Sequence, residues 1–365
     1  MKLGSLLACA LVIPLATVCP AAEPEGRWIT FVSHRSGRNL LYKMRPDGSE
    51  LSVIFGGELE GMPGLPEGLT LYREPHWGRQ SPDGRFFLDW AADVGLPLEK
   101  YNAPMRFMIY LGRLDGGRVR TLIPDGGEMF AWSPDSKRIA YSVISGRGHS
   151  DVGGLTPGAP STKIFTVGVD GSNEELVLEK PGIWNVQDWS PDGKKLLLGY
   201  ISAHSLAYAS YSLHEFDLEA SQRTKKEAGA KDYTFGLFYP SSQQIDAHLR
   251  LLSGSAQVVG GRYSPDGKLI AVEFKPERDA YNSSFQLGIL DPADLKLRPI
   301  LKAPGLRGPI CWSPAGREIL SSRWLDPQDD AKERMEGEHG LGIYAVRPDG
   351  SRVRFLATGW SPDWR

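Results

Sequence analysis

Histidine and acidic side chains are the groups in this chain best suited to chemistry. The chain has seven histidines, and imidazoles that converge on one point can ligate a metal ion. No two of them have the spacing of a metal-binding motif. The acidic run from Asp326 to Glu338 lacks the glycine and the spacing of a calcium-binding loop. We therefore assign no metal ligand, no cofactor and no catalytic residue, and keep a bound metal or calcium as the alternative.

A serine nucleophile is also not evident. The turn that carries one in many hydrolases reads Gly-x-Ser-x-Gly. Gly148, His149 and Ser150 begin in this way, but Val152 stands where the second glycine should be. The segment therefore does not predict a hydrolase.

A short motif recurs along the chain and predicts the scaffold that positions these residues. Each copy has Ser-Pro, in five of the six after an aromatic residue, and then the residues of a tight turn, which are Asp-Gly in three copies. A β-rich run follows the turn in every copy but the last. Most copies are about 50 residues apart, which is typical of a β-propeller whose units are four-stranded sheets. Gln80 replaces the aromatic residue of the first copy, and Ala315 replaces the aspartate of the fifth. The six copies begin at Ser81, Ser133, Ser190, Ser264, Ser313 and Ser361.

The last copy predicts how the ring closes. Trp360-Ser361-Pro362-Asp363 has no strand after its turn, and the residues from Gly26 onward supply one. We expect a blade whose innermost strand is C-terminal and whose other three strands are N-terminal. Such closure removes the exposed sheet edges that favour aggregation.

The predicted fold is therefore all-β, a six-bladed β-propeller with four-stranded antiparallel blades in a single domain of residues 23–365. The N- and C-terminal segments share one blade. The expected blades are 26–57 plus 358–365, 74–124, 128–180, 185–225, 257–303 and 308–357.

These residues resemble the TolB-like six-bladed β-propeller family, whose blades carry a WSPDG turn. The segment GRWITFVSHRSGRNLLYKMRPDGSE, residues 26–50, carries the resemblance most clearly, and the likeness covers residues 26–365. The best-known member of that family has a separate N-terminal α/β domain, for which the residues before 26 leave no room. The motif indicates the fold and does not specify a function.

Residues 1–22 have the features of an export signal. Lys2 precedes an apolar run, and small residues Ala21 and Ala22 end it. We therefore expect a periplasmic or secreted protein. A lipid anchor at Cys19 is disfavoured because the three residues before it do not form the small-residue box of a lipoprotein. Cys311 would then be the one cysteine left, and its place beside a tryptophan on an expected inner strand predicts a buried, unreactive thiol.

The charge composition excludes some partners. The 42 basic and 44 acidic side chains nearly balance, and no basic stripe indicates nucleic acid. We expect a monomer that has no membrane span and does not bind nucleic acid.

Loop length gives the main functional prediction. In a four-stranded blade, the first-to-second and third-to-fourth connections share one face of the ring, here called the short-turn face. The other connections share the opposite, long-loop face, where we expect the long segments 58–76, 90–105, 145–162, 225–257 and 324–341. Long loops on a rigid scaffold commonly carry binding and catalytic residues. The candidate contact residues on the long-loop face are Tyr101, His149, His204, Tyr233, Phe235, Tyr239, Trp324 and His339.

Three functions fit this prediction. The leading one is an exported, non-catalytic interaction module that binds a protein or a glycan through the long-loop face. The alternative is a propeller-type polysaccharide lyase or hydrolase, with a metal or a carboxylate and histidine site at the central channel. A third is a structural partner in a cell-envelope assembly.

Overall fold

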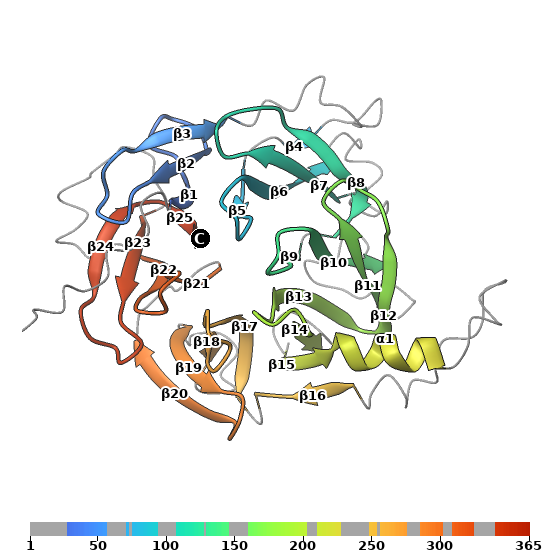
Figure 1. Ribbon diagram of the computed structural model, residues 1–365. Coiled ribbons are helices and arrows are strands. Elements are labelled where there is room, and N and C mark those ends of the chain that lie inside the picture. Colours follow the sequence, from blue (N-terminus) through green and yellow to red (C-terminus); the bar gives the residue numbers. More distant parts are fainter. Residues whose placement is uncertain are drawn as a thin grey trace, which may run out of the picture.

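The computed structural model is a ring of six β-sheets around a central axis (Figure 1). The residues of the expected export signal lie outside the described part of the chain. The structure describes residues 28–56, 71–72, 75–93, 107–127, 129–145, 160–202, 210–227, 248–253, 256–275, 285–301, 309–324 and 340–365.

Each sheet is one blade and is antiparallel, as predicted. The strands are β1 (Ile29–Ser33), β2 (Leu40–Met44), β3 (Ser52–Phe55), β4 (Leu71–Tyr72), β5 (Arg79–Gln80), β6 (Phe86–Asp93), β7 (Phe107–Arg113), β8 (Arg120–Gly126), β9 (Phe130–Trp132), β10 (Arg138–Ser145), β11 (Ser161–Gly168), β12 (Glu175–Pro181), β13 (Ile183–Trp189), β14 (Lys195–Ser202), β15 (Ser210–Asp217), β16 (Leu249–Leu251), β17 (Gln257–Tyr263), β18 (Ile270–Lys275), β19 (Gln286–Asp291), β20 (Lys296–Leu301), β21 (Cys311–Trp312), β22 (Ile319–Trp324), β23 (Leu341–Val346), β24 (Arg354–Thr358) and β25 (Trp360–Trp364).

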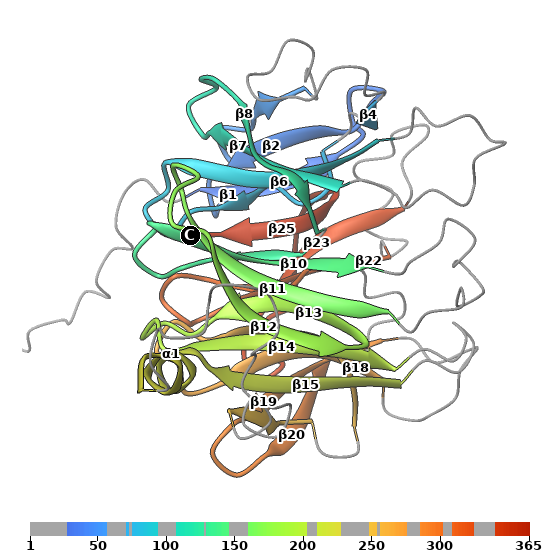
Figure 2. The same cartoon turned by 90° about the vertical axis from the view of Figure 1, so that its right-hand side faces the viewer.

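From the centre outward, blade one is β25-β1-β2-β3, blade three is β9 to β12, blade four is β13 to β16, blade five is β17 to β20 and blade six is β21 to β24. In blade two, the short strands β4 and β5 both pair with β6, which is followed outward by β7 and β8. Seen from the side, the C-terminus and helix α1 (Leu218–Glu227) lie at one end of the ring, and second strands such as β10 run toward the other (Figure 2). The first end is the short-turn face.

The repeated serine closes the turn between the inner and the second strand. Ser133 Oγ donates to Asp135 Oδ1 (2.7 Å) and accepts the N–H of Arg138 (2.8 Å). In the copy that has Ala315, Ser313 Oγ still accepts the N–H groups of Arg317 (3.0 Å) and Glu318 (2.9 Å). Side-chain bonds of this local kind favour turns over regular structure. The interpretation of the motif as turn chemistry is confirmed.

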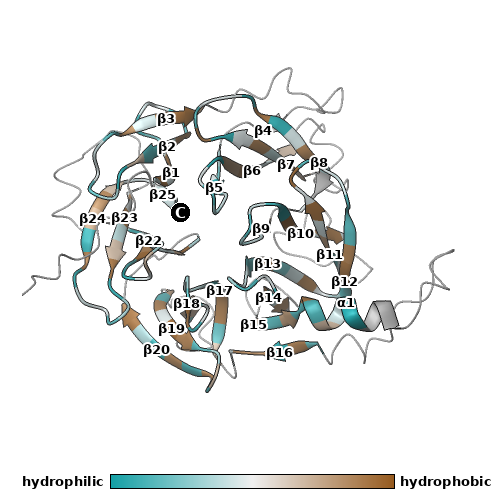
Figure 3. Cartoon of the chain, viewed as in Figure 1, coloured by the Kyte–Doolittle hydropathy of each residue, from teal (hydrophilic) through white to brown (hydrophobic). Residues whose placement is uncertain are grey.

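The hydrophobic core is divided among the gaps between blades. The strands of the blades carry many apolar residues (Figure 3), and successive side chains of a strand point to opposite faces of its sheet. Among the described residues, six buried apolar clusters form, and each joins two adjacent blades. One of them combines Phe31 of blade one with Leu320 of blade six. Because every blade needs two neighbours, the apolar faces are all covered only in a closed ring.

Ring closure by both ends of the chain is confirmed. The predicted alignment of the C-terminal strand with the first N-terminal strand is wrong by four residues, because Trp360 was expected opposite Ile29. β25 pairs with β1, with Trp364 opposite Ile29. In other blades, the residue equivalent to Ile29 pairs with the aromatic residue before Ser-Pro. In blade three, for example, Ile139 pairs with Trp132. Arg365 therefore stands where those blades have the motif serine, and Ser361 lies inside the inner strand rather than at a turn.

Packing explains this register. Trp364 is 2% exposed and belongs to the cluster between blades one and six, whereas Trp360 is half-buried. A register shift in the pairing of β1 with β25 takes up one extra residue of β25, and Ser361 has a φ of 53°. Trp364 therefore occupies the core position that the sequence assigned to Trp360.

Blade four also differs from the expected range, 185–225. Its outer strand is β16, and the residues expected to complete the blade form α1 instead. Asp217 caps this helix, because its Oδ1 accepts the N–H of Ala220 at 2.8 Å. Residues 225–257 were expected to connect two blades on the long-loop face. The structure instead has the third strand, β15, before this segment and the fourth strand, β16, within it, and the connection between those two strands belongs to the short-turn face.

The register of β25 makes a direct prediction. Trp364→Ala should lower the free energy of unfolding by about 3–5 kcal/mol, the usual cost of deleting a fully buried tryptophan. Trp360→Ala, at a half-buried site, should cost about 1–2 kcal/mol. Urea denaturation of the two variants and the parent measures both values. A larger loss for Trp360→Ala would contradict the observed register.

Candidate functional site

One of the eight predicted contact residues, Trp324, is described by the structure. It ends β22 on the long-loop face, and its side chain is 46% exposed. Arg323 beside it stacks over the ring of Tyr344 at 3.8 Å. The other seven lie outside the described residues: Tyr101, His149, His204, Tyr233, Phe235, Tyr239 and His339. The described elements on either side of Tyr233, Phe235 and Tyr239 in the sequence are α1, which follows the third strand of blade four, and β16, which is its fourth strand.

The described histidines do not come together. His34 Nδ1 contacts Asn39 Oδ1 (3.0 Å), and His214 Nε2 contacts Ser212 Oγ (2.9 Å). His76 stacks on Trp90 with ring centres 4.0 Å apart. Within the described ranges, no group of three histidine, cysteine, aspartate or glutamate residues could hold a metal ion.

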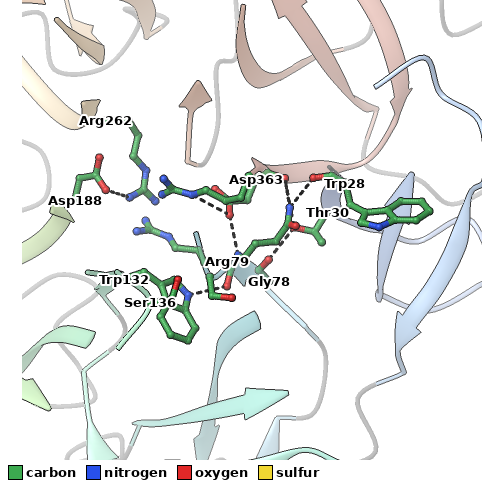
Figure 4. A network of polar contacts seen from close by, with 12 residues as sticks. Trp28, Thr30, Gly78, Arg79, Trp132, Ser136, Asp188, Arg262 and Asp363 are labelled. Carbon is green, nitrogen blue, oxygen red and sulfur yellow. Dashed lines mark hydrogen bonds and ion pairs between the residues drawn. The ribbon is translucent and has the colours of Figure 1, made fainter. Parts of the chain in front are cut away.

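A polar cluster that the sequence analysis did not single out lies at the centre of the ring (Figure 4). Its members come from the inner strands. Each lies two residues before the motif serine or, in blade one, two residues before Arg365, which stands in the place of that serine. Going round the ring from blade one to blade six, this position holds Asp363, Arg79, Ala131, Asp188, Arg262 and Cys311. The order acid, arginine, small residue thus occurs twice.

The backbone contacts repeat in the same way. Asp363 Oδ2 accepts the N–H of Gln80 (2.8 Å), and Asp188 Oδ2 accepts the N–H of Tyr263 (2.9 Å). Each aspartate therefore fixes the inner strand of the next blade. The indole Nε1 groups of Trp132 and Trp312 donate to the carbonyls of the two arginines at 3.1 and 3.0 Å.

The two buried arginines reach across the ring to one carbonyl. Nη1 of Arg79 donates to the carbonyl of Phe130 (2.7 Å) and to that of Gln187 (3.1 Å). Nη1 of Arg262 donates to the same Gln187 carbonyl (2.5 Å). Two like-charged guanidinium groups therefore lie side by side, away from solvent.

The two arginines differ in their counter-charge. Arg262 forms a buried ion pair with Asp188 (3.1 Å), and losing one partner of such a pair costs about 3–5 kcal/mol. Among the described residues, no ion pair joins Arg79 to Asp363. Asp363 instead lies 3.9 Å from the Nε of Arg365. Nε of Arg79 has no hydrogen-bond partner, although the residue is only 4% exposed.

The pKa values reflect this imbalance. Burial, and then the positive charge of Arg262, lower the pKa of Arg79 well below its usual value. Burial also acts to lower the pKa of Arg365, but Asp363 and Asp188 outweigh it and the net shift is upward. Burial raises the pKa of the Cys311 thiol, so the prediction of a buried, unreactive cysteine agrees with its environment. Asp363 and Asp188 thus act as counter-charges for both Arg79 and Arg365.

Asp89 positions the chain that leads into Arg79. Its carboxylate accepts the N–H groups of His76 (2.9 Å), Trp77 (3.1 Å) and Gly78 (3.2 Å). Burial raises the pKa of Asp89 to about 6, in spite of these donors and the N–H of Trp90. Gln80, the departure from the aromatic residue of the motif, adds a second tie: its Nε2 donates to the carbonyls of Trp28 (2.9 Å) and Asp363 (2.8 Å).

Comparison with known proteins identifies the class of fold. No family model matches the chain. The uncharacterized protein Atu1656 of Agrobacterium fabrum is 31% identical over 133 residues, which are 33% of this chain and 38% of that protein. The crystal structure of TolB from Acinetobacter baumannii has a TM-score of 0.57 at 16% identity and covers 93% of this chain. The structure of putative TolB from Agrobacterium tumefaciens has a TM-score of 0.52 at 14% identity, covering 92% of this chain and 91% of its own.

The fold is thus a TolB-like six-bladed β-propeller. The chain spans 66% of the Acinetobacter TolB chain. Among the described residues, no helix is long and apolar enough to cross a membrane.

Asp89 makes the stability of the protein depend on pH. Its folded-state pKa of about 6 lies above its usual value of 3.8, so the folded protein holds this proton more tightly than the unfolded chain does. The resulting stabilisation is complete below pH 4 and is lost as the pH rises through 6, by about 3 kcal/mol in all. We expect the unfolding free energy of the parent, minus that of Asp89→Asn, to fall by this amount between pH 4 and pH 8. Urea denaturation across this range measures it, and a constant difference would contradict the shift.

Proposed function

We propose that the protein is an exported, non-catalytic binding module that engages a protein or a glycan through its long-loop face. The observation that carries the proposal is the place of Trp324. Of the exposed large apolar side chains in the described part of the chain, it is the only aromatic one, and it stands at the rim of the long-loop face.

The chemistry of this rim supports binding. Tryptophan is enriched at the energetic centres of protein interfaces, and its ring can also stack on other flat or apolar surfaces. Gly340 has a φ of 63° and lies against Trp324, where a Cβ would be 3.3 Å from the indole Cε3. The indole thus lies against the backbone of Gly340, and 46% of Trp324 is exposed.

A second aromatic group lies near this face in blade four, two blades away from Trp324. Trp184 at the start of β13 packs on Tyr200 near the end of β14, with ring centres 4.6 Å apart. Lys180 lies over the same indole at 5.5 Å. Trp184 is only 6% exposed and belongs to the core between blades three and four. It therefore supports the rim, where Tyr200 and Lys180 are the partly exposed groups.

The proposal is tested by replacing Trp324 with a photoreactive amino acid in the full chain, including residues 1–22. Leu295 is the matched control, because it is 42% exposed and lies in a turn of the short-turn face. Irradiation in cells should give one discrete protein or glycan adduct at position 324 and not at 295. No adduct at 324, or the same adducts at both positions, would contradict a specific surface there.

Binding of the captured partner then gives a quantitative check. Trp324→Ala should weaken affinity by about 30-fold, the effect of truncating a central aromatic contact. Leu295→Ala should leave it unchanged, and circular dichroism should show both variants folded. Release of shortened products from a captured glycan would contradict the non-catalytic part of the proposal.

A further inference from the structure

A cavity lined mainly by arginine lies at the short-turn face of blade six. Its volume is about 550 Å³, which is within the range of small-molecule sites. The turn between β21 and β22 and the turn between β23 and β24 form its walls, so it lies at the opposite end of β22 from Trp324. The lining residues are Arg317, Glu318, Arg347, Arg352, Val353 and Arg354.

One of the four arginines is already paired. Arg354 binds the carboxylate of Glu318 through Nε (3.1 Å) and Nη2 (2.8 Å). Its Nη1 donates to the carbonyl of Pro46 in blade one (3.1 Å). These contacts fix one wall of the cavity and account for the only acidic side chain that lines it.

The acids next to the cavity do not balance the other arginines. Hydrogen bonds to Ser351 and, to a lesser degree, the charge of Arg347 lower the pKa of Asp349, so this aspartate belongs to the count. In the adjoining turn of blade one, the charge that acts on Asp47 is that of Arg45. Four arginines against Glu318 and Asp349 leave two positive charges at the cavity.

The same turn in blade one shows what is unusual here. Residues 45–50 and 347–352 both begin Arg-Pro-Asp-Gly-Ser, and the sixth residue has a φ of 53° in both. In blade one the sixth residue is Glu50, which pairs with Arg45 at 3.2 Å. In blade six it is Arg352, so the position that supplies the counter-ion of Arg45 carries a second positive charge beside Arg347. Within the part of the chain that the structure describes, no ion pair joins Arg347 or Arg352 to an acidic side chain.

We propose that this cavity binds a phosphate monoester, held by Arg347 and Arg352 with Arg317 beside them. A phosphate monoester carries about two negative charges and three acceptor oxygens. It therefore balances the excess charge, and it can accept from more than one guanidinium fork at once. Val353 is 40% exposed and gives the cavity an apolar wall for the carbon skeleton of the ligand.

The phosphate monoester can belong to a free small molecule or to a lipid headgroup. Both sources share the same chemistry, and two probes distinguish them. Glycerol phosphate represents the free molecule, and vesicles of phosphatidylcholine with one-fifth phosphatidic acid present the same group on a lipid. Tighter binding of glycerol phosphate indicates a small-molecule site, and tighter binding of the vesicles indicates a headgroup site.

Calorimetric titration of the full chain with glycerol phosphate, and flotation with the vesicles, test the proposal. At least one probe should bind in a saturable way, with one site per chain. Succinate, which carries the same charge on two planar carboxylates, should bind at least about tenfold more weakly than glycerol phosphate. Absence of saturable binding of both phosphate probes would overturn the proposal, and so would equal binding of succinate and glycerol phosphate.

A charge reversal locates the site without removing a structural contact. Arg352→Glu gives the turn of blade six the acid that blade one has, so Arg347 gains a counter-ion and the unfolding temperature should not fall. Binding of the phosphate probe should fall at least about tenfold, because a guanidinium is lost and a negative charge is added. Arg352→Lys keeps the charge without the planar fork and should give an intermediate affinity.

The equivalent turn of blade two supplies the matched control. Residues 113–118 read Arg-Leu-Asp-Gly-Gly-Arg, and Nε of Arg113 donates to Asp115 Oδ1 at 3.0 Å. Arg118 is exposed and holds the position of Arg352. Arg118→Glu makes the same change in net charge and should bind the probe as the parent does. Equal binding by Arg352→Glu and the parent, or equal losses in Arg352→Glu and Arg118→Glu, would overturn the assignment.

Discussion

The pairing of β25 with β1 is the interaction on which the rest of the structure depends. Every blade has two apolar faces, and each of the six apolar clusters joins two neighbours. Blade one completes two of these clusters, and its inner strand comes from the other end of the chain. Without β25 the core between blades one and six would lose Trp364, and the inner edge of β1 would be an unpaired strand edge.

The same strand links the fold to the centre of the ring. β25 brings Asp363 against the backbone of Gln80 and places Arg365 beside Asp363. Asp89 fixes the turn before Arg79, and Asp188 fixes the strand that carries Arg262. Closing the ring thus assembles a charged cluster at its axis, while the outward-facing Trp324 lies on the other face.

The sequence predicted the fold because its strongest signal is local. A serine that bonds to a residue two positions on and to the N–H five positions on defines a turn without reference to distant residues. The register of β25 could not be predicted, because Trp360-Ser361-Pro362 imitates the motif and only packing selects Trp364. The outer strand of blade four was missed because a capped helix intervenes before β16. Arg79, Asp188, Arg262 and Asp363 lie far apart in the chain, so their meeting depends on the closed ring. Their shared place before the motif serine, or its equivalent, is the one sequence signal that could have found them.

The central claim, that residues 360–364 close the ring, is tested most directly by removing them. The measurement is the urea unfolding transition of a chain that ends at Gly359, compared with the parent and with a chain that lacks only Arg365. The account predicts that the shorter chain loses its cooperative transition or unfolds at a much lower urea concentration, because an inner strand and its buried tryptophan are gone. The chain without Arg365 keeps all of β25 and should unfold cooperatively, close to the parent. Equal transition midpoints for the chain that ends at Gly359 and the parent would contradict closure by this strand.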